Sequence, residues 1–136
     1  MPPCRVDSTS CTKYARTVTR LTKKYSELLK DLDNLYDEIA KDHDLEGECV
    51  PRLKYPEIAG KIWKYRCPDT TNNRGKSYGF RVIGFLRELN VMYLIFIYHH
   101  KDVGDLSKED YRKLVQGLEA DLRPTLPFDD PSSQPE

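Results

Sequence analysis

Three extended runs between residues 61 and 101 constrain the fold more than any other part of the chain. They read GKIWKYRC, YGFRVIGFL and VMYLIFIYHHK, and a polar loop, PDTTNNRGKS, separates the first two. Successive side chains of a strand point to opposite faces, so residues two apart share a face. Lys64 and Arg66 therefore belong to one face of the first strand. If Arg81 of the second strand joins them, we predict a sheet face that carries three fixed cations.

This face is better suited to a polyanion than to a hydrophobic core, because Gly79 leaves room beside Arg81. Residues 52–81 hold eight basic and two acidic side chains, although the formal net charge of the whole chain is zero. The zero net charge argues against a protein that coats nucleic acid nonspecifically, whereas the local positive charge predicts an anion site at one place on the surface. A solvated basic face without a function is the alternative.

The remaining segments predict an α+β domain. Residues 4–7 suggest a short strand, and two amphipathic helical patterns follow. The first has a basic outer face from Lys13 to Lys24 that is typical of a solvated helix; weak phosphate contacts within a larger nucleic-acid surface are the alternative. Residues 48–60 contain prolines and glycine and are predicted to be a loop. The short connection at 87–90 predicts that the last two strands are antiparallel neighbours. The last strand, apolar at nearly every position, is expected to be covered on both faces.

The predicted order is β-α-α-β-β-β-α, with an N-terminal helical hairpin packed on a small, mostly antiparallel sheet. For the helix boundaries we expect an N-cap among Ser8, Thr9 and Ser10, a cap at Ser26 and a stop at Gly47. Ser107 and Asp110 predict a capping box for the last helix. Residues 1–122 are expected to form one domain, and the proline-rich residues 123–136 a disordered tail.

Composition excludes several classes of protein. The longest apolar run, residues 91–98, is far shorter than a membrane span of about 20 residues. The first residues do not resemble a signal peptide, and the four cysteines show no CxxC spacing. We therefore expect a cytoplasmic protein with reduced thiols, no membrane association and no cofactor.

Two further motifs suggest chemistry. Gly75-Lys76-Ser77 is not a phosphate-binding P-loop, because the required earlier glycine is Thr70 and a strand, not a helix, is expected to follow. His99 and His100 end the last strand and are expected to point to opposite faces, which argues against a shared zinc ion. One of them is a candidate proton-transfer group, and a solvated side chain is the alternative.

The runs IWKYR, RGKSYGFRVI and YLIFIY followed by a lysine, together with DLS before the last helix, resemble the RelE-type toxins of the RelE/ParE toxin–antitoxin superfamily. The segment TKYARTVTRLTKKYSELLKDLDNLYDEI is similar to the helical hairpin of that family. The similarity extends from about Val6 to Leu118. Its most specific part is the combination of K-x-R, GKS-x-G-x-R and an apolar strand at these spacings.

The resemblance implies a compact RelE-like fold and a toxin that cuts messenger RNA, usually on the ribosome, in the cytoplasm of a prokaryote. It also implies neutralisation by a cognate antitoxin protein. The basic active-site positions of the family fall on Lys64, Arg66 and Arg81, and a further catalytic group falls within His99, His100 and Lys101. The chain departs from the family pattern at Tyr78, where many relatives have glycine, and at the histidine pair, where relatives often have a small residue.

Metal-independent RNA cleavage needs a base for the 2′-OH, cations for the pentacovalent phosphate and an acid for the leaving 5′-oxygen. Lys64, beside two other cations, is the candidate base, because like charge disfavours its charged form. His99, His100 and Lys101 all remain candidates for the acid. The candidate RNA-binding residues are Lys61, Arg74, Lys76 and Tyr78, with an aromatic ring available for base stacking. A DNA analogue of a cleaved RNA is expected to be inert.

Two other readings stay open. A ParE-like gyrase poison, or an inactive binding module, has the same fold and does not cleave RNA. A plain RNA-binding module keeps the cations but needs no proton-transfer group. The set of Lys64, Arg66 and Arg81 favours the nuclease over the gyrase poison, and the residues from His99 to Lys101 weigh against the plain RNA-binding module.

Overall fold

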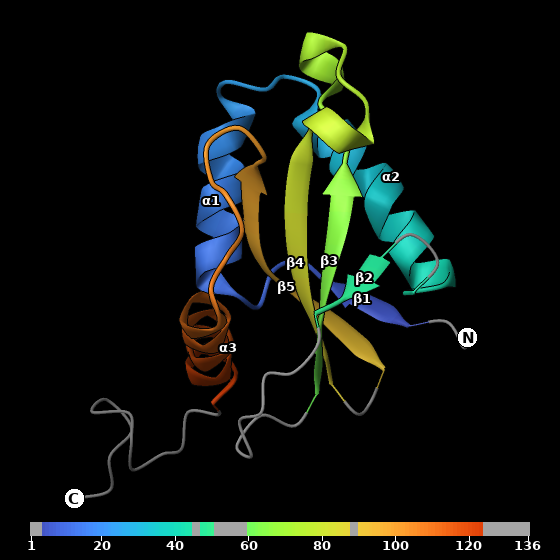
Figure 1. Cartoon of the computed structure of the whole chain (residues 1–136). Helices are drawn as coiled ribbons and strands as arrows, with labels where there is room; N and C mark the ends of the chain where they lie inside the picture. Colours follow the sequence, from blue (N-terminus) through green and yellow to red (C-terminus); the bar gives the residue numbers. More distant parts are fainter. Residues whose placement is uncertain (1–3, 45–46, 51–59, 88–89, 124–136) are drawn as a thin grey trace, which may run out of the picture.

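The computed structural model describes residues 4–44, 47–50, 60–87 and 90–123. In that part of the chain five strands form one mixed sheet, and three helices pack on it (Figure 1). The strands are β1 (Arg5–Asp7), β2 (Gly47–Cys49), β3 (Lys61–Cys67), β4 (Phe80–Arg87) and β5 (Val91–His99). The helices are α1 (Thr12–Thr22), α2 (Leu28–Lys41) and α3 (Lys108–Leu122). The α+β class predicted from the sequence is therefore confirmed.

The strands lie in the order β1-β5-β4-β3-β2. Only the β1–β5 pair is parallel; β2–β3, β3–β4 and β4–β5 are antiparallel, as the short connection at 87–90 predicted. The predicted loop at 48–60 is wrong at its start, because Gly47–Cys49 pairs with β3 and adds a strand to the expected order. Residues 51–59 lie outside the described residues.

Helices α1 and α2 form the expected hairpin. α1 packs against β5, and α2 packs against β1 and β3 (Figure 1). Tyr14, Leu32 and Ile39 are buried in one core with Phe80 and Val82 from the sheet. Because Phe80 and Val82 are two residues apart on β4, they mark the face of the sheet that the hairpin covers.

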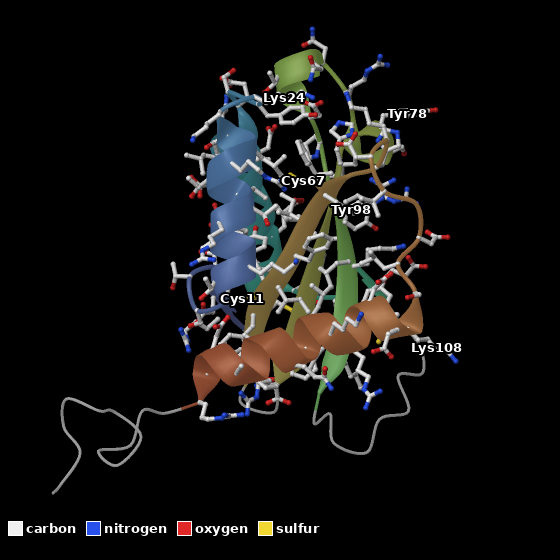
Figure 2. The ribbon with its side chains drawn as sticks, turned by 90° about the vertical axis from the view of Figure 1, so that its left-hand side faces the viewer. Cys11, Lys24, Cys67, Tyr78, Tyr98 and Lys108 are labelled. Atoms are coloured by element: carbon white, nitrogen blue, oxygen red, sulfur yellow. The ribbon has the colours of Figure 1, made fainter. Side chains whose placement is uncertain are left out.

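Strand β5 is buried at every position except Tyr93 and Phe96, which are partly exposed. α3 contacts β5 and α1, and buries Tyr111, Val115 and Leu118. Figure 2 shows α3 running across the strands below Tyr98, with Tyr78 towards the opposite end of the sheet. The nearly complete cover predicted for β5 is confirmed.

The helix boundaries agree only in part with the sequence. Ser107 and Asp110 form the predicted capping box of α3. The predicted cap at Ser8–Ser10 is wrong, because α1 begins after Cys11 and the Ser10 hydroxyl instead donates to Asp7 at 2.7 Å. The cap at Ser26 is also wrong: Glu27 is the N-cap of α2, and its backbone N–H donates to Thr71.

The stop predicted at Gly47 is wrong as well. α2 ends at Lys41, where Asp42 turns to extended backbone, and Gly47 belongs to β2. Its close approach to the sheet explains the glycine, because a Cβ there would lie 2.5 Å from the Tyr65 ring.

Further expectations concern the cysteines, the Gly75-Lys76-Ser77 segment, membrane spans and the C-terminal tail. All four cysteines are free. Gly75-Lys76-Ser77 runs into a single 3₁₀ turn and then into β4, as the rejection of a P-loop required. No helix of the described residues is long and apolar enough to cross a membrane. The predicted tail at 123–136 lies outside the described residues beyond Arg123.

Candidate functional site

Three cations share one face of the sheet. Arg66 of β3 lies directly opposite Arg81 of β4, and Lys64 precedes Arg66 by two residues on the same strand. Tyr98 of β5 lies opposite Arg81 on its other side. This side of the sheet is the one that the α1–α2 hairpin does not cover, because Cys67, Phe80 and Val82 alternate with the cations. We call Lys64, Arg66 and Arg81 the cationic face; the predicted placement on one face is confirmed.

Arg81 is fixed by the backbone that precedes it. Nη1 donates to the carbonyls of Lys76 and Phe80 at 3.1 and 3.3 Å, and Nη2 donates to that of Ser77 at 3.0 Å. Burial, and then the neighbouring Arg66, lower the pKa of Arg81 from its ordinary value. A guanidinium has five N–H donors, so two remain for a ligand.

Arg66 and Lys64 differ in their surroundings. The side chain of Arg66 is exposed and makes no hydrogen bond or ion pair with the described residues. The ammonium of Lys64 lies 4.0 Å from carboxylate oxygens of both Glu48 and Asp105, and its side chain is only 23% exposed. The sequence argument for Lys64 as a base considered only cations, whereas the structure adds two carboxylates beside it.

The segment 76–79, called here the partition turn, separates the cationic face from a pocket at the end of the strands. Arg81 holds it from one side, through the carbonyls of Lys76 and Ser77. On the other side, the backbone N–H of His100 donates to the carbonyl of Gly79 at 3.0 Å and extends the β4–β5 ladder by one bond. The turn packs tightly, since a Cβ on Gly79 would lie 2.1 Å from the carbonyl oxygen of Cys67.

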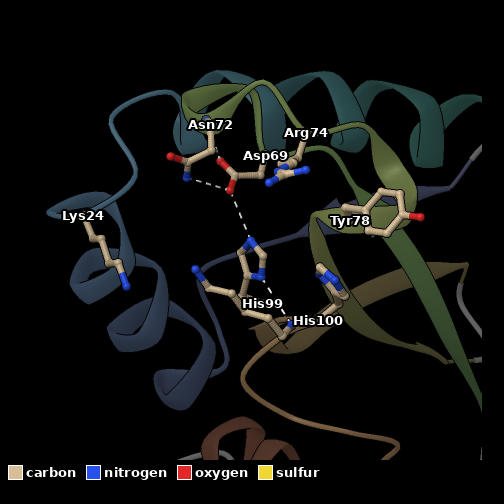
Figure 3. Close-up of a pocket in the computed structure, with 8 residues that line it drawn as sticks. Lys24, Asp69, Asn72, Arg74, Tyr78, His99 and His100 are labelled. Carbon is tan, nitrogen blue, oxygen red and sulfur yellow. Dashed lines mark hydrogen bonds and ion pairs between the residues drawn. The ribbon is translucent and has the colours of Figure 1, made fainter.

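The pocket beyond this turn has a volume of about 490 Å³ (Figure 3). We call it the end pocket. Its walls come from the C-terminal side of α1, the loop between β3 and β4, the partition turn and the end of β5. Its lining residues are Lys24, Asp69, Asn72, Arg74, Tyr78, His99, His100 and Lys101.

His99 forms the floor of this pocket. It is 3% exposed, and its ring stacks on Tyr25 and meets Phe80 edge-on. Nδ1 lies 3.4 Å from the backbone N–H of Lys101 and can only accept there, so Nε2 carries the proton and donates to Asp69 at 3.1 Å. Both ring nitrogens are thus used within the protein, and His99 lies on the helix-covered side of the sheet. These contacts suit a structural role better than proton transfer to a substrate.

Asp69 is a buried carboxylate with several donors. Besides His99, it accepts from the backbone N–H and the side-chain amide of Asn72, at 3.2 and 2.9 Å. Burial raises the pKa of Asp69, but the hydrogen bonds from Asn72 and His99 outweigh it and leave the pKa below its ordinary value. The loop between β3 and β4 is therefore tied to the end of β5.

His100 is placed differently. Its Nδ1 lies 3.3 Å from the carbonyl oxygen of Gly79, which can only accept, so Nδ1 carries a proton. Nε2 has no hydrogen-bond partner among the described residues, and the ring meets Tyr78 edge-on at 5.7 Å. His100 follows the last residue of β5 and lines the end pocket, next to the partition turn. Of the candidates for the acid, His100 is the imidazole with a nitrogen available to a ligand.

The expected opposite orientation of the two histidines is wrong. Their ring centres lie 5.1 Å apart, with an angle of 34° between the planes. The reason is that β5 ends at His99 and His100 begins a turn, so strand alternation no longer applies. Among the described residues, no group of three or more His, Cys, Asp or Glu side chains could hold a metal ion.

The remaining predicted residues separate into three places. Arg74, Tyr78 and Lys101 line the end pocket. Lys76 instead pairs with Glu38 of α2 at 3.3 Å, and Lys61 lies at the start of β3, away from the pocket and on the opposite parity from Lys64. The structure thus divides most of the candidates between the cationic face and the end pocket and leaves Lys61 and Lys76 outside both.

Two lining residues of the end pocket, Asp69 and Asn72, were missed by sequence reasoning, and Lys24 was considered only as part of a basic helix face. Lys24 belongs to a basic helical run that looks like an ordinary solvated face. Asp69 and Asn72 lie in a polar loop, whose composition predicts a turn and does not reveal which residues point inward.

Comparisons with known proteins identify no match for this chain. No protein-family model matches the chain. No curated protein and no solved structure matches it either.

Proposed function

We propose that this chain is a metal-independent endoribonuclease with a RelE-like fold and that it acts as the toxin of a type II toxin–antitoxin module. Its substrate is messenger RNA, cut on the ribosome in the cytoplasm of a prokaryotic cell, and a cognate antitoxin protein neutralises it. The toxin role, the ribosome and the antitoxin rest on the resemblance in sequence. The chemistry is supported by the geometry of the site.

The observation that carries the proposal is the pairing of Arg66 with Arg81 across β3 and β4, with Lys64 on the same face. Two guanidinium groups side by side repel each other and are stabilised by a shared anion. A phosphodiester matches them, because a guanidinium presents N–H groups in the geometry that phosphate oxygens accept. His100, whose Nδ1 donates to the carbonyl of Gly79 two residues before Arg81, is the proposed proton-transfer group.

The proposed reaction assigns one task to each group. Lys64 Nζ, in its neutral form, accepts the proton of the 2′-OH, and the 2′-oxygen attacks the phosphorus. Arg66 and the two remaining N–H groups of Arg81 bind the non-bridging oxygens as negative charge develops. The bond to the 5′-oxygen breaks, and His100 Nε2–H, in the imidazolium form, gives that oxygen its proton. The products are a 2′,3′-cyclic phosphate and a 5′-hydroxyl.

The test is cleavage of a defined RNA by the purified full-length chain in the presence of EDTA. We expect fragments with 2′,3′-cyclic phosphate and 5′-hydroxyl ends, and no cleavage of the same substrate with a 2′-deoxy sugar at the scissile position. Arg66→Ala should lower the rate about 10²–10³-fold, as the loss of one donor to a developing oxyanion typically does. Lys61→Ala is the matched control on the same strand and should cleave at the wild-type rate.

A second experiment addresses the gyrase alternative in cells. Tightly controlled expression of the wild type should arrest growth with new transcript 5′ ends, and Arg66→Ala should not. Growth arrest with intact transcripts and DNA damage would favour the ParE-like reading and reject the nuclease.

A further inference from the structure

The end pocket has the properties of a nucleotide site, and the reaction proposed above uses only His100 from it. Its volume of about 490 Å³ lies within the range of small-molecule pockets. Three exposed cations, Lys24, Arg74 and Lys101, line it, and none of them makes an ion pair with the described residues. In Figure 3, Lys24 and Arg74 lie on different sides of the pocket.

The acidic residue of the pocket does not cancel these charges at the rim. The Asp69 carboxylate is buried beneath the pocket, and His99 and Asn72 donate to it. Its hydrogen-bonding capacity is therefore largely used within the protein. The exposed wall is left positive and suits an anion.

An aromatic side chain adds a second kind of recognition. Tyr78 is 61% exposed and projects from the partition turn at the edge of the pocket (Figure 3). Exposed aromatic rings beside a basic groove bind single-stranded nucleic acid by stacking on its bases. Cations and an exposed ring together match the two parts of a nucleotide, the phosphate and the base.

The pocket and the cationic face are separated by a single turn. Tyr78 and Gly79 lie between the two, and His100 contacts both residues. A strand whose scissile phosphate lies on Arg66 and Arg81 has only the partition turn to cross. We infer that the end pocket binds a neighbouring nucleotide of the same RNA, with its phosphate on Lys24, Arg74 and Lys101 and its base against Tyr78. This inference rests on the proposed ribonuclease function, and it moves Lys101 from catalysis to binding.

Binding is tested with a fluorescent 2′-O-methyl RNA hexamer, which cannot be cleaved at its 2′ positions. The double variant Lys24→Ala/Lys101→Ala should raise Kd about tenfold and lower the slope of log K against log salt by about 0.7, because the contact with one phosphate of a single strand is lost. Lys23→Ala/Lys30→Ala, which removes two exposed lysines outside the pocket, is the matched control. Equal Kd values for the two double variants would overturn the inference.

Tyr78 is tested in the same assay. Tyr78→Ala should weaken hexamer binding about tenfold through lost stacking, whereas Tyr78→Phe should bind like the wild type. If Tyr78→Ala binds like the wild type, the base does not rest on this ring and the inference fails. A free nucleoside monophosphate that competes as well as the hexamer would show a site for free nucleotides, which also overturns it.

Cleavage assays separate this inference from the function on which it rests. A dinucleotide bound on the cationic face is too short to reach across the partition turn, so Lys24→Ala/Lys101→Ala should lose much less kcat/KM on it than on the hexamer. On the hexamer the same variant should lose about tenfold in kcat/KM, because binding energy from remote parts of a substrate supports the reaction. An equal loss on both substrates would overturn the inference. If the wild type cleaves neither, the proposed function fails while the binding assay still decides the pocket.

Discussion

The cationic face and the end pocket lie on either side of one turn, yet they are built in different ways. Lys64, Arg66 and Arg81 belong to two adjacent strands and meet through the ladder that pairs Arg66 with Arg81. The end pocket draws on α1, a loop, a turn and the end of β5. A site on paired strands follows from alternation and register, whereas a site on loops depends on packing that a local pattern does not record.

The two regions also hold their charges differently. On the cationic face the carboxylates of Glu48 and Asp105 are largely exposed and lie 4.0 Å from Lys64. In the end pocket the carboxylate of Asp69 is buried and tightly hydrogen-bonded. Acidic side chains therefore compete with a ligand on the face and support the structure in the pocket.

Substitution of the residue between the two regions should have the largest effect. Gly79→Ala would place a Cβ 2.1 Å from the Cys67 carbonyl oxygen and 2.8 Å from backbone atoms of Pro68 and Asp69. Backbone atoms cannot rotate away, so we expect a loss of about 3 kcal/mol in the free energy of unfolding, measured by urea denaturation.

Gly75→Ala is the matched control for this change. No atom lies within 4 Å of its would-be Cβ, and its φ of −75° suits any residue. Its stability should stay within about 0.5 kcal/mol of the wild type. Equal stability of the two variants would show that the partition turn does not pack as described.

The two arginines of the cationic face should separate activity from stability. Both Arg66→Ala and Arg81→Ala should cut RNA about 10²–10³-fold more slowly. Arg81→Ala should also lower the free energy of unfolding by about 2 kcal/mol, because three carbonyls lose a charged donor. Arg66 is exposed and makes no such bonds, so its variant should unfold like the wild type. Parallel activity and denaturation measurements decide this, and equal destabilisation would contradict the assignment.

Asp69→Asn should act on the end pocket through stability. The pKa of Asp69 in the folded protein lies below its ordinary value of 3.8. Its carboxylate therefore stabilises the fold fully above about pH 4, and the contribution is lost as pH falls through the lower, folded-state pKa. We expect the variant to lose about 1–2 kcal/mol at neutral pH, because an amide has one acceptor oxygen for the donors of both His99 and Asn72.

Denaturation at a series of pH values measures this effect. The variant should show a flatter decline in stability below pH 4 than the wild type. Asp37→Asn, on the exposed surface of α2, should retain the wild-type pH dependence. A decline that is unchanged in Asp69→Asn would mean that the carboxylate is not the group responsible.

The smallest effect is expected from a carboxylate beside Lys64. Asp105 is 99% exposed, so its 4.0 Å contact is a weak, solvent-screened pair. Asp105→Asn should raise kcat/KM for RNA about twofold, with the difference fading at high salt. Asp37→Asn again serves as control, and a decrease in Asp105→Asn would show that this carboxylate assists the reaction.

Most of the architecture was readable from periodicity. Alternation identified β3 and β4, the 3.6-residue pattern identified the hairpin, and the Ser107 capping box marked the start of α3. The strand β2 was missed because three residues are too few for a pattern, and only its pairing with β3 makes it a strand. The cap at Ser10 failed because its hydroxyl donates to Asp7, and the cap at Ser26 failed because the N-cap of α2 is one residue later, at Glu27, whose N–H donates to Thr71.

For the candidate site, the alternation of side chains predicted which residues share a face within the strands, but not where side chains lie beyond the strand ends. It placed Lys64 with Arg66 and Arg81 correctly. It could not choose between His99 and His100, because that choice depends on which face the hairpin covers and on the point where β5 gives way to a turn. Lys76 was predicted to bind RNA because it is a lysine in a polar loop. The sequence could not show that Glu38, on α2, forms an ion pair with it.

The partition turn is held by hydrogen bonds on both sides. Arg81 donates to the carbonyls of Lys76 and Ser77, and the backbone N–H of His100 donates to that of Gly79. A ligand that orders Arg81 on the cationic face also orders the carbonyls of Lys76 and Ser77, and with them the partition turn that forms one wall of the end pocket. Occupancy of either compartment should then raise the affinity of the other by the same factor, since thermodynamic linkage is reciprocal. Such cooperativity would make an RNA long enough to occupy both sites bind more tightly than a short one before the cleavage step.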